Sequence, residues 1–354
     1  MSTEHNHCGP CDPCKPRCKK KKKRPRPPRC PDLARLCPAS GKFFRRVTLF
    51  GADAMSGRSG HVFFDCNGCL SNEQMEAIGA LLGTEVMFVR TTDPNATIFD
   101  TINVQGGSIQ ESSGTGALIA AAVIRDLVRC GRADPLTIRF VNTGATIPIT
   151  FDAQGTPGFT LGPPEFGIVI AGTDRADLIA CLGSTVPGGF TEADLIPGLP
   201  IQEVRPGPGL LRTVLVPVNE AGLAKIQAID ADDPAFIACQ STVTANTGVF
   251  GIFEVFTLAT VDPDVDIHAR VFSGALGLPE DPISAAPNAS LGAYLAQYGL
   301  FTPPFSVTVE QGAEAGSPGF VTVDVTDESG SLRISIIGNV NTAAEGVFNV
   351  SCPA

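Results

Sequence analysis

Residues His268–Leu295 read HARVFSGALGLPEDPISAAPNASLGAYL, and the pattern changes twice within this one stretch. Ile267–Phe272 predict a β-strand, and Gly274–Pro279 predict a bend rich in glycine and proline. Two adjacent carboxylates, Glu280 and Asp281, then precede a helix of small and apolar residues. The first N–H groups of a helix can hold an anion, and a carboxylate beside them can move a proton. We therefore expect a small-molecule site at this helix start.

The length and composition indicate a well-packed protein of about two domains. The chain has 354 residues, of which 43% are hydrophobic and 18% charged. The longest unbroken apolar run, Ala117–Ile124, is too short to cross a bilayer. The first residues lack the apolar segment of a signal peptide, so we expect a cytoplasmic protein with no membrane partner.

Charge divides the chain into a basic tail and an acidic body. Residues 1–46 contain 14 Lys and Arg against three acidic residues, whereas the rest contains 12 basic and 33 acidic residues. An acidic body argues against nucleic-acid binding by the folded part. The tail, with its run Lys19–Lys23, could contact a polyanion or remain a solvated extension.

Cysteine is also concentrated in the tail, which holds six of the 12 cysteines. Four of them, Cys8, Cys11, Cys14 and Cys18, have a spacing similar to an iron–sulfur run, but Lys19 replaces the usual proline. They are weak metal candidates, and zinc binding or cross-linking would explain them as well. We interpret the scattered cysteines of the body as free thiols in or near the core, because disulfides are rare in the cytoplasm.

The remaining chain predicts two halves of similar plan. Each half runs through strands, a helix, more strands and a helix start made of small residues. In the first half, Ser112–Gly116 open a helix that is apolar nearly all round and is therefore expected at the centre of the sheet. We divide the chain into four parts: a disordered tail (1–43), a first half (44–163), a second half (164–336), and a C-terminal strand and tail (337–354).

Glu85 and Asp281 are the candidate catalytic residues, one from each half. Glu85 lies between a helix and an apolar strand, where a solvated loop acid is the simpler interpretation. Asp281 could equally be an ordinary helix cap. Two acids that meet in a cleft would instead suit cofactor-independent proton transfer. Gly114, Thr115 and Gly116 could form either an anion cradle or a flexible helix start.

The residues of the opening stretch resemble the PhzF family, the phenazine-biosynthesis-type isomerases. Arg270-Val271-Phe272, Gly277 and Glu280-Asp281-Pro282 look like the family pattern R-x-F-x-P-x-x-G-x-x-E-D-P, with Gly274 in place of its first proline. Four further segments match the family in the correct order: Leu70–Met75, Thr84–Val89, Leu291–Leu295 and Glu310–Gly316. The resemblance covers most of residues 44–350.

The resemblance implies an α/β (α+β) fold similar to diaminopimelate epimerase, with two halves that are each a mixed, barrel-like sheet around a central helix. It also implies a proton transfer between carbons of a small carboxylate metabolite, without metal or organic cofactor, and a homodimer. Glu85 would be the family's acid/base residue and Asp281 its active-site aspartate. Gly114, Thr115, Gly116, Ser284, Ala285 and Ala286 would hold the substrate.

The sequence departs from the family pattern in three places. Thr115 stands where the family has its active-site histidine, and a hydroxyl does not titrate near neutral pH. Ala285 and Ala286 replace a glycine and a substrate-holding serine, and Arg58 lies where the family has G-N-P. Loss of one positioned acid or base typically costs about 10²- to 10⁴-fold in rate.

Two functions therefore remain open. The first is a PhzF-like isomerase or epimerase with a partly degenerate site. The second is a non-catalytic binding or structural protein on the same fold, cross-linked through its tail into an assembly such as a spore or particle coat.

Overall fold

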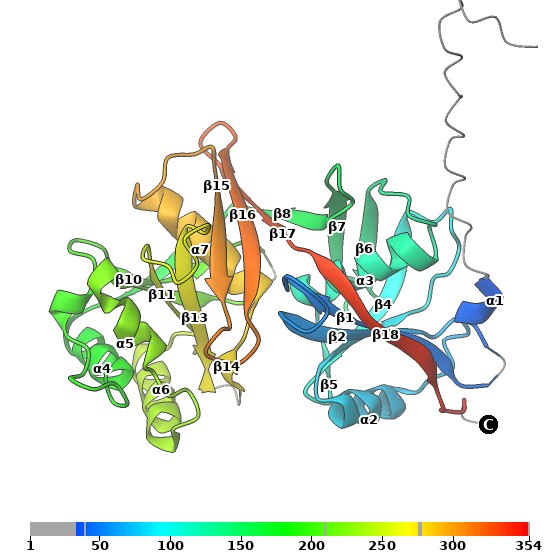
Figure 1. Cartoon of the computed structure of the whole chain (residues 1–354), viewed down its shortest axis with the longest axis horizontal. Coiled ribbons are helices and arrows are strands. Elements are labelled where there is room, and N and C mark those ends of the chain that lie inside the picture. The colour runs from blue at the N-terminus through cyan, green and yellow to red at the C-terminus, as the bar shows by residue number, and fades with distance from the viewer. Residues whose placement is uncertain (1–32, 39, 209, 275–277, 353–354) are drawn as a thin grey trace, which may run out of the picture.

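The computed structural model describes residues 33–38, 40–208, 210–274 and 278–352. Figure 1 shows two bodies side by side, each with strands wrapped around one helix. The four tail cysteines considered as metal ligands lie outside the described residues. Within the described ranges, no helix is long and apolar enough to cross a membrane.

The first body is a mixed sheet around helix α3 (Gly114–Leu127). Its strands are β1 (Lys42–Leu49), β2 (Arg58–Phe64), β3 (Glu85–Val89), β4 (Ile98–Gln105), β5 (Ser108–Gln110), β6 (Leu136–Phe140) and β7 (Thr146–Phe151). All residues of this helix except Arg125 and Asp126 are apolar or small, and twelve of its fourteen residues are buried. A helix that is apolar all round must be covered on all sides, and the curved sheet provides this cover.

The second body repeats this plan around helix α7 (Ala285–Gln297). Its strands are β8 (Pro157–Leu161), β9 (Glu165–Ile170), β10 (Ile201–Arg205), β11 (Thr213–Pro217), β12 (Phe253–Thr257), β13 (Ile267–Ser273), β14 (Leu278–Asp281), β15 (Phe305–Gln311), β16 (Gly319–Asp327) and β17 (Leu332–Ile337). Both central helices belong to one continuous apolar core.

Outer helices cover the other faces of the two sheets. In the first body this is α2 (Asn72–Leu82), and in the second body α4 (Gly172–Leu182), α5 (Leu223–Gln227) and α6 (Pro234–Thr247). Each side has its own apolar cluster, to which α2 contributes Met75 and α6 contributes Phe236. Helix α2 begins with a capping box, in which Ser71 and Gln74 satisfy each other's backbone N–H groups.

Two strands connect the bodies. Strand β8 pairs with β7 of the first body and with β17 of the second. After β17, the C-terminal strand β18 (Val340–Phe348) returns to the first body and pairs with β1. The last residues of the chain therefore complete the sheet with which it starts.

The predicted disorder of residues 1–43 is wrong at its C-terminal end. Residues Leu33–Leu36 form the short helix α1, and Lys42 is buried at the start of β1. An ion pair of 2.8 Å joins the Lys42 ammonium to the buried Asp65 carboxylate. This pair, which composition could not reveal, fixes the end of the tail to the sheet.

The interpretation of the body cysteines as free thiols is also wrong. Disulfides join Cys37 to Cys66, Cys69 to Cys352, and Cys181 to Cys239. The three Cα–Cα distances are 5.9, 5.4 and 5.7 Å, within the range of disulfides. The partners are up to 283 residues apart in sequence, so only the fold brings them together.

A candidate active site between the two halves

Arg58 brings the two predicted catalytic carboxylates together. Its Nη1 lies 2.5 Å from Asp281 Oδ1, and its Nε lies 3.6 Å from Glu85 Oε2. Arg58 is the first residue of β2 and Glu85 the first of β3, whereas Asp281 ends β14 in the other half. The three side chains are 12%, 0% and 13% exposed, so water has little access to them.

Glu85 is held on one oxygen by the start of helix α3. Its Oε1 accepts hydrogen bonds from Asn103 Nδ2 at 2.9 Å and from Ser113 Oγ. Ser113 is the N-cap of the helix, and its Oγ also accepts from the Gly116 N–H at 2.9 Å. A side chain at Gly116 would place its Cβ 2.8 Å from Glu85 Oε1, so this position requires glycine.

The other oxygen, Glu85 Oε2, is buried and has no hydrogen-bond partner among the described residues. Among the described residues, the Arg58 guanidinium is the cation that pairs with it. The fixed Oε1 sets the orientation of the carboxylate, which leaves Oε2 as the atom that could exchange a proton with a ligand.

The charge of Arg58 is secured by the same geometry. Burial by itself lowers the pKa of Arg58, but the neighbouring carboxylates of Asp281 and Glu85 outweigh this effect and raise it above its ordinary value. Arg58 therefore remains a cation. Its Nη1 also lies 3.4 Å from the Ile283 carbonyl oxygen, which links it to the backbone that leads into α7.

The start of helix α7 is built differently from that of α3. Its N-cap residue, Ser284, makes no side-chain cap hydrogen bond. The backbone is instead positioned by two buried amides: Asn288 Nδ2 donates to the Ser284 carbonyl at 2.7 Å, and Gln311 Nε2 donates to the Asp281 carbonyl at 2.8 Å. Asn288 Nδ2 also donates to Gln311 Oε1 at 2.7 Å. The first N–H groups of α7 thus remain without a side-chain cap.

The starts of α3 and α7 lie close to each other. A Cβ at Gly114 would lie 3.7 Å from the Ala285 Cβ and 2.9 Å from the Phe159 ring. Thr115 is buried beside it, with 6% exposure. The predicted substrate-holding residues Gly114, Thr115, Gly116, Ser284, Ala285 and Ala286 therefore belong to one region, next to the two carboxylates.

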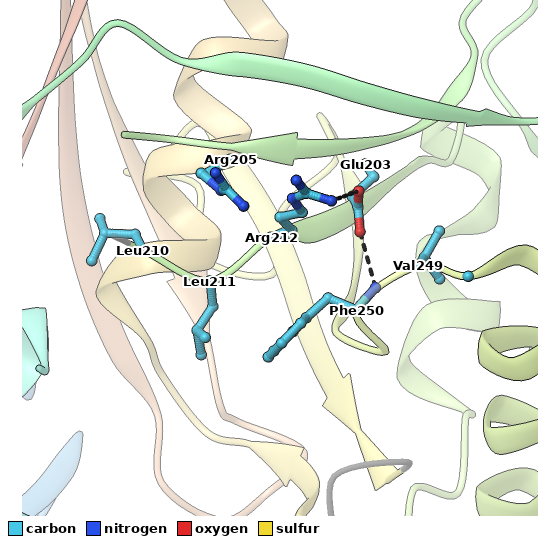
Figure 2. A pocket seen from close by; sticks show the side chains of 8 residues that line it. Glu203, Arg205, Leu210, Leu211, Arg212, Val249 and Phe250 are labelled. Atoms are coloured by element: carbon cyan, nitrogen blue, oxygen red, sulfur yellow. Dashed lines mark hydrogen bonds and ion pairs between the residues drawn. The ribbon is translucent and has the colours of Figure 1, made fainter. Parts of the chain in front are cut away.

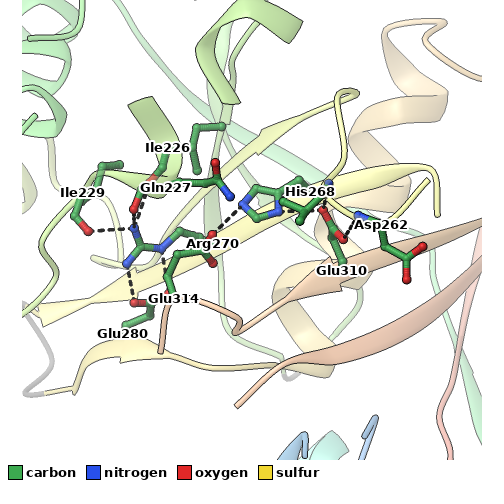
Figure 3. A network of polar contacts seen from close by, with 10 residues as sticks. Ile226, Gln227, Ile229, Asp262, His268, Arg270, Glu280, Glu310 and Glu314 are labelled. Atoms are coloured by element: carbon green, nitrogen blue, oxygen red, sulfur yellow. Dashed lines mark hydrogen bonds and ion pairs between the residues drawn. The ribbon is translucent and has the colours of Figure 1, made fainter. Parts of the chain in front are cut away.

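Glu280, the neighbour of Asp281, serves a different purpose. It forms a bidentate ion pair with Arg270 at 2.9 and 2.6 Å. Arg270 Nη1 also donates to the carbonyls of Ile226 at 2.8 Å and Ile229 at 2.7 Å (Figure 3). This buried cluster joins β13, β14 and the end of α5.

His268 belongs to a structural network beside it. Its Nδ1 lies 2.9 Å from Glu310 Oε1, and its Nε2 lies 3.4 Å from Glu314 Oε1 (Figure 3). Glu310 also accepts the N–H groups of Val261 and Asp262. The described residues contain no group of His, Cys, Asp and Glu that could hold a metal ion.

Sequence reasoning missed Arg58, Asn103, Ser113 and Gln311 as parts of the site. Arg58 carried a signal, because it departs from the family pattern. Asn103 and Gln311 lie in strands that hold other polar residues as well, so the sequence gives no clear signal of their burial.

Comparisons with known proteins support the sequence resemblance. Residues 200–346 match the sequence model of the PhzC-PhzF family, described as phenazine biosynthesis-like protein. An uncharacterized isomerase from Clostridium acetobutylicum is 28% identical over 186 residues, covering 51% of this chain and 56% of that protein. The uncharacterized isomerase YddE of Escherichia coli is 31% identical over 176 residues, covering 49% and 51%. The resemblance to the PhzF family is confirmed. The chain spans about half the length of these curated relatives.

Solved structures extend the PhzF-like fold to most of the chain. A PhzF-family protein of Bacillus anthracis superposes with a TM-score of 0.71 at 24% identity, covering 88% of this chain and all of that protein. A predicted epimerase of Pseudomonas aeruginosa gives a TM-score of 0.64 at 21% identity, with 88% and 100% covered. The predicted fold class of two halves with mixed sheets is confirmed.

Proposed function

We propose that this PhzF-like protein is an isomerase or epimerase that moves a proton between carbons of a small carboxylate metabolite. The observation that carries the proposal is the meeting of Glu85 and Asp281, one from each half, at Arg58. Two enclosed carboxylates can take a proton from one carbon and return it to another without any cofactor.

Each residue has a distinct role in this mechanism. Glu85 takes the proton on Oε2, because Oε1 is held by Asn103 and Ser113. Asp281 is the second proton-carrying group, since Thr115 can donate a hydrogen bond but cannot carry a proton near neutral pH. Arg58 binds the substrate carboxylate, which replaces one of its two protein carboxylates as partner.

The uncapped start of α7 completes the substrate site. Ser284, Ala285 and Ala286 offer backbone N–H groups, and the positive end of the helix dipole favours an anion there. Gly114, Thr115 and Gly116 provide the opposite wall. Ala286 has no hydroxyl for the substrate, so its contribution is limited to the backbone.

Solvent exchange tests the catalytic proposal. The protein is incubated in D₂O with small carboxylic acids that carry an acidic C–H bond, including trans-4-hydroxy-L-proline, and deuterium uptake is followed by NMR. Glu85→Gln should abolish uptake into any acid that exchanges with the wild type. The control is Glu328→Gln, which changes an exposed ion pair. Exchange that persists at the wild-type rate in Glu85→Gln contradicts the proposal.

A second candidate is a non-catalytic binding or structural protein on the same fold. It is favoured by the Arg58 ion pairs, which occupy both carboxylates, and by the disulfides of the body, which are typical of an oxidising location or an extracellular particle. A cytoplasmic location, a homodimer and contacts between the tail and polyanions are separate proposals.

Restoring the family residues separates the two candidates. If the site has lost its catalysis, the wild type should show no exchange. The double variant Arg58→Asn, Thr115→His should then show exchange. For the structural function, non-reducing gels of native material should show cross-linked species that disappear when Cys8, Cys11, Cys14 and Cys18 are all replaced by serine. Identical migration of both proteins contradicts it.

A further inference from the structure

A cavity of about 470 Å³ lies in the second half, away from the elements that carry Glu85 and Arg58. It is formed by the end of β10, by residues 210–212 just before β11, and by the segment between α6 and β12 (Figure 2). Its volume is within the range of small-molecule sites, which are typically 300–1,000 Å³. The mechanism proposed above does not use it.

Two arginines line this cavity. Arg212 is 43% exposed, and its Nη1 is 3.4 Å from Glu203 Oε2, a long contact that leaves the guanidinium free to turn. Arg205 Nη1 is 3.1 Å from Glu165 Oε2, but the Arg205 Nε is buried and has no hydrogen-bond partner among the described residues. A buried guanidinium N–H without an acceptor is unfavourable, so an acceptor supplied by a ligand would stabilise it.

The carboxylate of Glu203 does not fill that need. It is 1% exposed, and its Oε1 accepts the Phe250 N–H at 2.9 Å (Figure 2). A Cβ at Gly167 would lie 3.0 Å from Oε2, so the neighbouring strand leaves Glu203 little room to move. Glu203 therefore positions the Val249–Phe250 segment at the edge of the cavity.

Apolar side chains form the other wall. Leu211 is 49% exposed and Phe250 is 40% exposed, and Figure 2 shows both beside the arginines together with Leu210. Large apolar side chains that are exposed beside two arginines suit a ligand with one apolar part and one anionic part.

We propose that this cavity binds an apolar carboxylic acid. The carboxylate would accept hydrogen bonds from Arg205 and Arg212, since guanidinium groups match the geometry of a carboxylate. The apolar part would lie against Leu211 and Phe250. This site does not depend on the chemistry at Glu85, so either proposal can fail without the other.

Calorimetric titration with 3-phenylpropionate and with its neutral analogue 3-phenylpropan-1-ol tests the proposal on the full-length protein. The acid should bind at least tenfold more tightly than the alcohol. Arg212→Gln and Leu211→Asn should each weaken binding of the acid by about tenfold or more. Both side chains are exposed by more than 40%, so these variants are chosen to leave the fold intact, which is checked by their unfolding temperature.

Two controls locate the binding. Arg333→Gln, which changes an exposed arginine elsewhere, should bind the acid like the wild type. Arg58→Asn should also leave binding unchanged. The proposal is overturned if the wild type does not distinguish acid from alcohol, if Arg212→Gln binds as well as the wild type, or if Arg58→Asn alone removes binding.

Discussion

Two arginine–carboxylate clusters in this protein differ although they share neighbouring residues. Glu280 pairs with Arg270 inside the second half, whereas Asp281 pairs with Arg58 of the first half. Consecutive residues of a strand point to opposite faces of the sheet, which separates Glu280 from Asp281. Adjacent acids in a sequence motif can therefore have unrelated functions, one in the fold and one in a site.

The surroundings of the two arginines differ as well. Arg270 has one carboxylate that accepts two hydrogen bonds, and backbone carbonyls satisfy its remaining Nη1. Arg58 is shared between two carboxylates, and its contact with Glu85 is 3.6 Å long. The contacts of Arg270 are complete without a ligand, whereas Arg58 can exchange one of its carboxylate partners for a ligand.

The largest expected effect is the loss of Arg270. Arg270→Met leaves Glu280 buried without its cation and should lower the free energy of unfolding by about 3–5 kcal/mol. Urea unfolding measures the loss. A loss below about 1 kcal/mol would show that water replaces the guanidinium, and the contrast between the two clusters would then disappear.

Glu254 is a buried carboxylate without a cation partner among the described residues, and both arginine–carboxylate clusters can be compared with it. It is fully buried on β12, neither oxygen has a hydrogen-bond partner among the described residues, and burial raises the pKa of Glu254 to about 8. The folded protein then binds this proton more tightly than the unfolded chain. Stability should be highest below about pH 4.3 for this group and fall by several kcal/mol as the pH rises to about 8.

Glu254→Gln tests this pH dependence. The variant should lack the fall in stability between about pH 4.3 and pH 8 that is assigned to Glu254, as measured by thermal unfolding over this range. A pH profile that stays parallel to that of the wild type would mean that Glu254 is ionised and paired in the folded protein.

Arg58→Asn should have an intermediate effect. The variant leaves two partly enclosed carboxylates without a cation, so we expect a loss of about 1–3 kcal/mol in urea unfolding. A loss as large as that of Arg270→Met would identify Arg58 as a structural residue and weaken its assignment to substrate binding.

The two helix starts give the smallest and best matched contrast. Ser113→Ala removes the cap of α3 and a donor to Glu85, and should cost about 1 kcal/mol. Ser284→Ala at α7 should cost little, because Ser284 makes no cap hydrogen bond. Equal losses in urea unfolding would show that α7 is capped in solution and would argue against free N–H groups there.

The central helix of the first half was predictable because its apolar residues surround the whole helix. The observed α3 (Gly114–Leu127) begins within Ser112–Gly116, where the sequence predicts the helix start. Strands such as β6 and β17 alternate more and less buried residues over five or six positions, and such alternation is a local signal in the sequence. Helices α4 and α6 were missed, and the weakly amphipathic sequence of α6 explains this in part.

The candidate site was only partly predictable, because its decisive contacts join distant residues. Glu85 and Asp281 could be selected from a resemblance, but their meeting depends on Arg58, which is 223 residues from Asp281. The partners of the cysteines depend on the fold in the same way. Local sequence patterns predict whether a residue is buried. They do not predict which charged residue of the other half it will contact.

The disulfide between Cys69 and Cys352 turns most of the chain into a covalent ring. The bond spans 283 residues, and the same short turn also carries Cys66, which holds Cys37 beside the N-terminal strand. Both ends of the folded part are thus fastened at one place. A single backbone cut anywhere inside the ring would leave one molecule of unchanged mass apart from the added water, and only reduction would release two pieces.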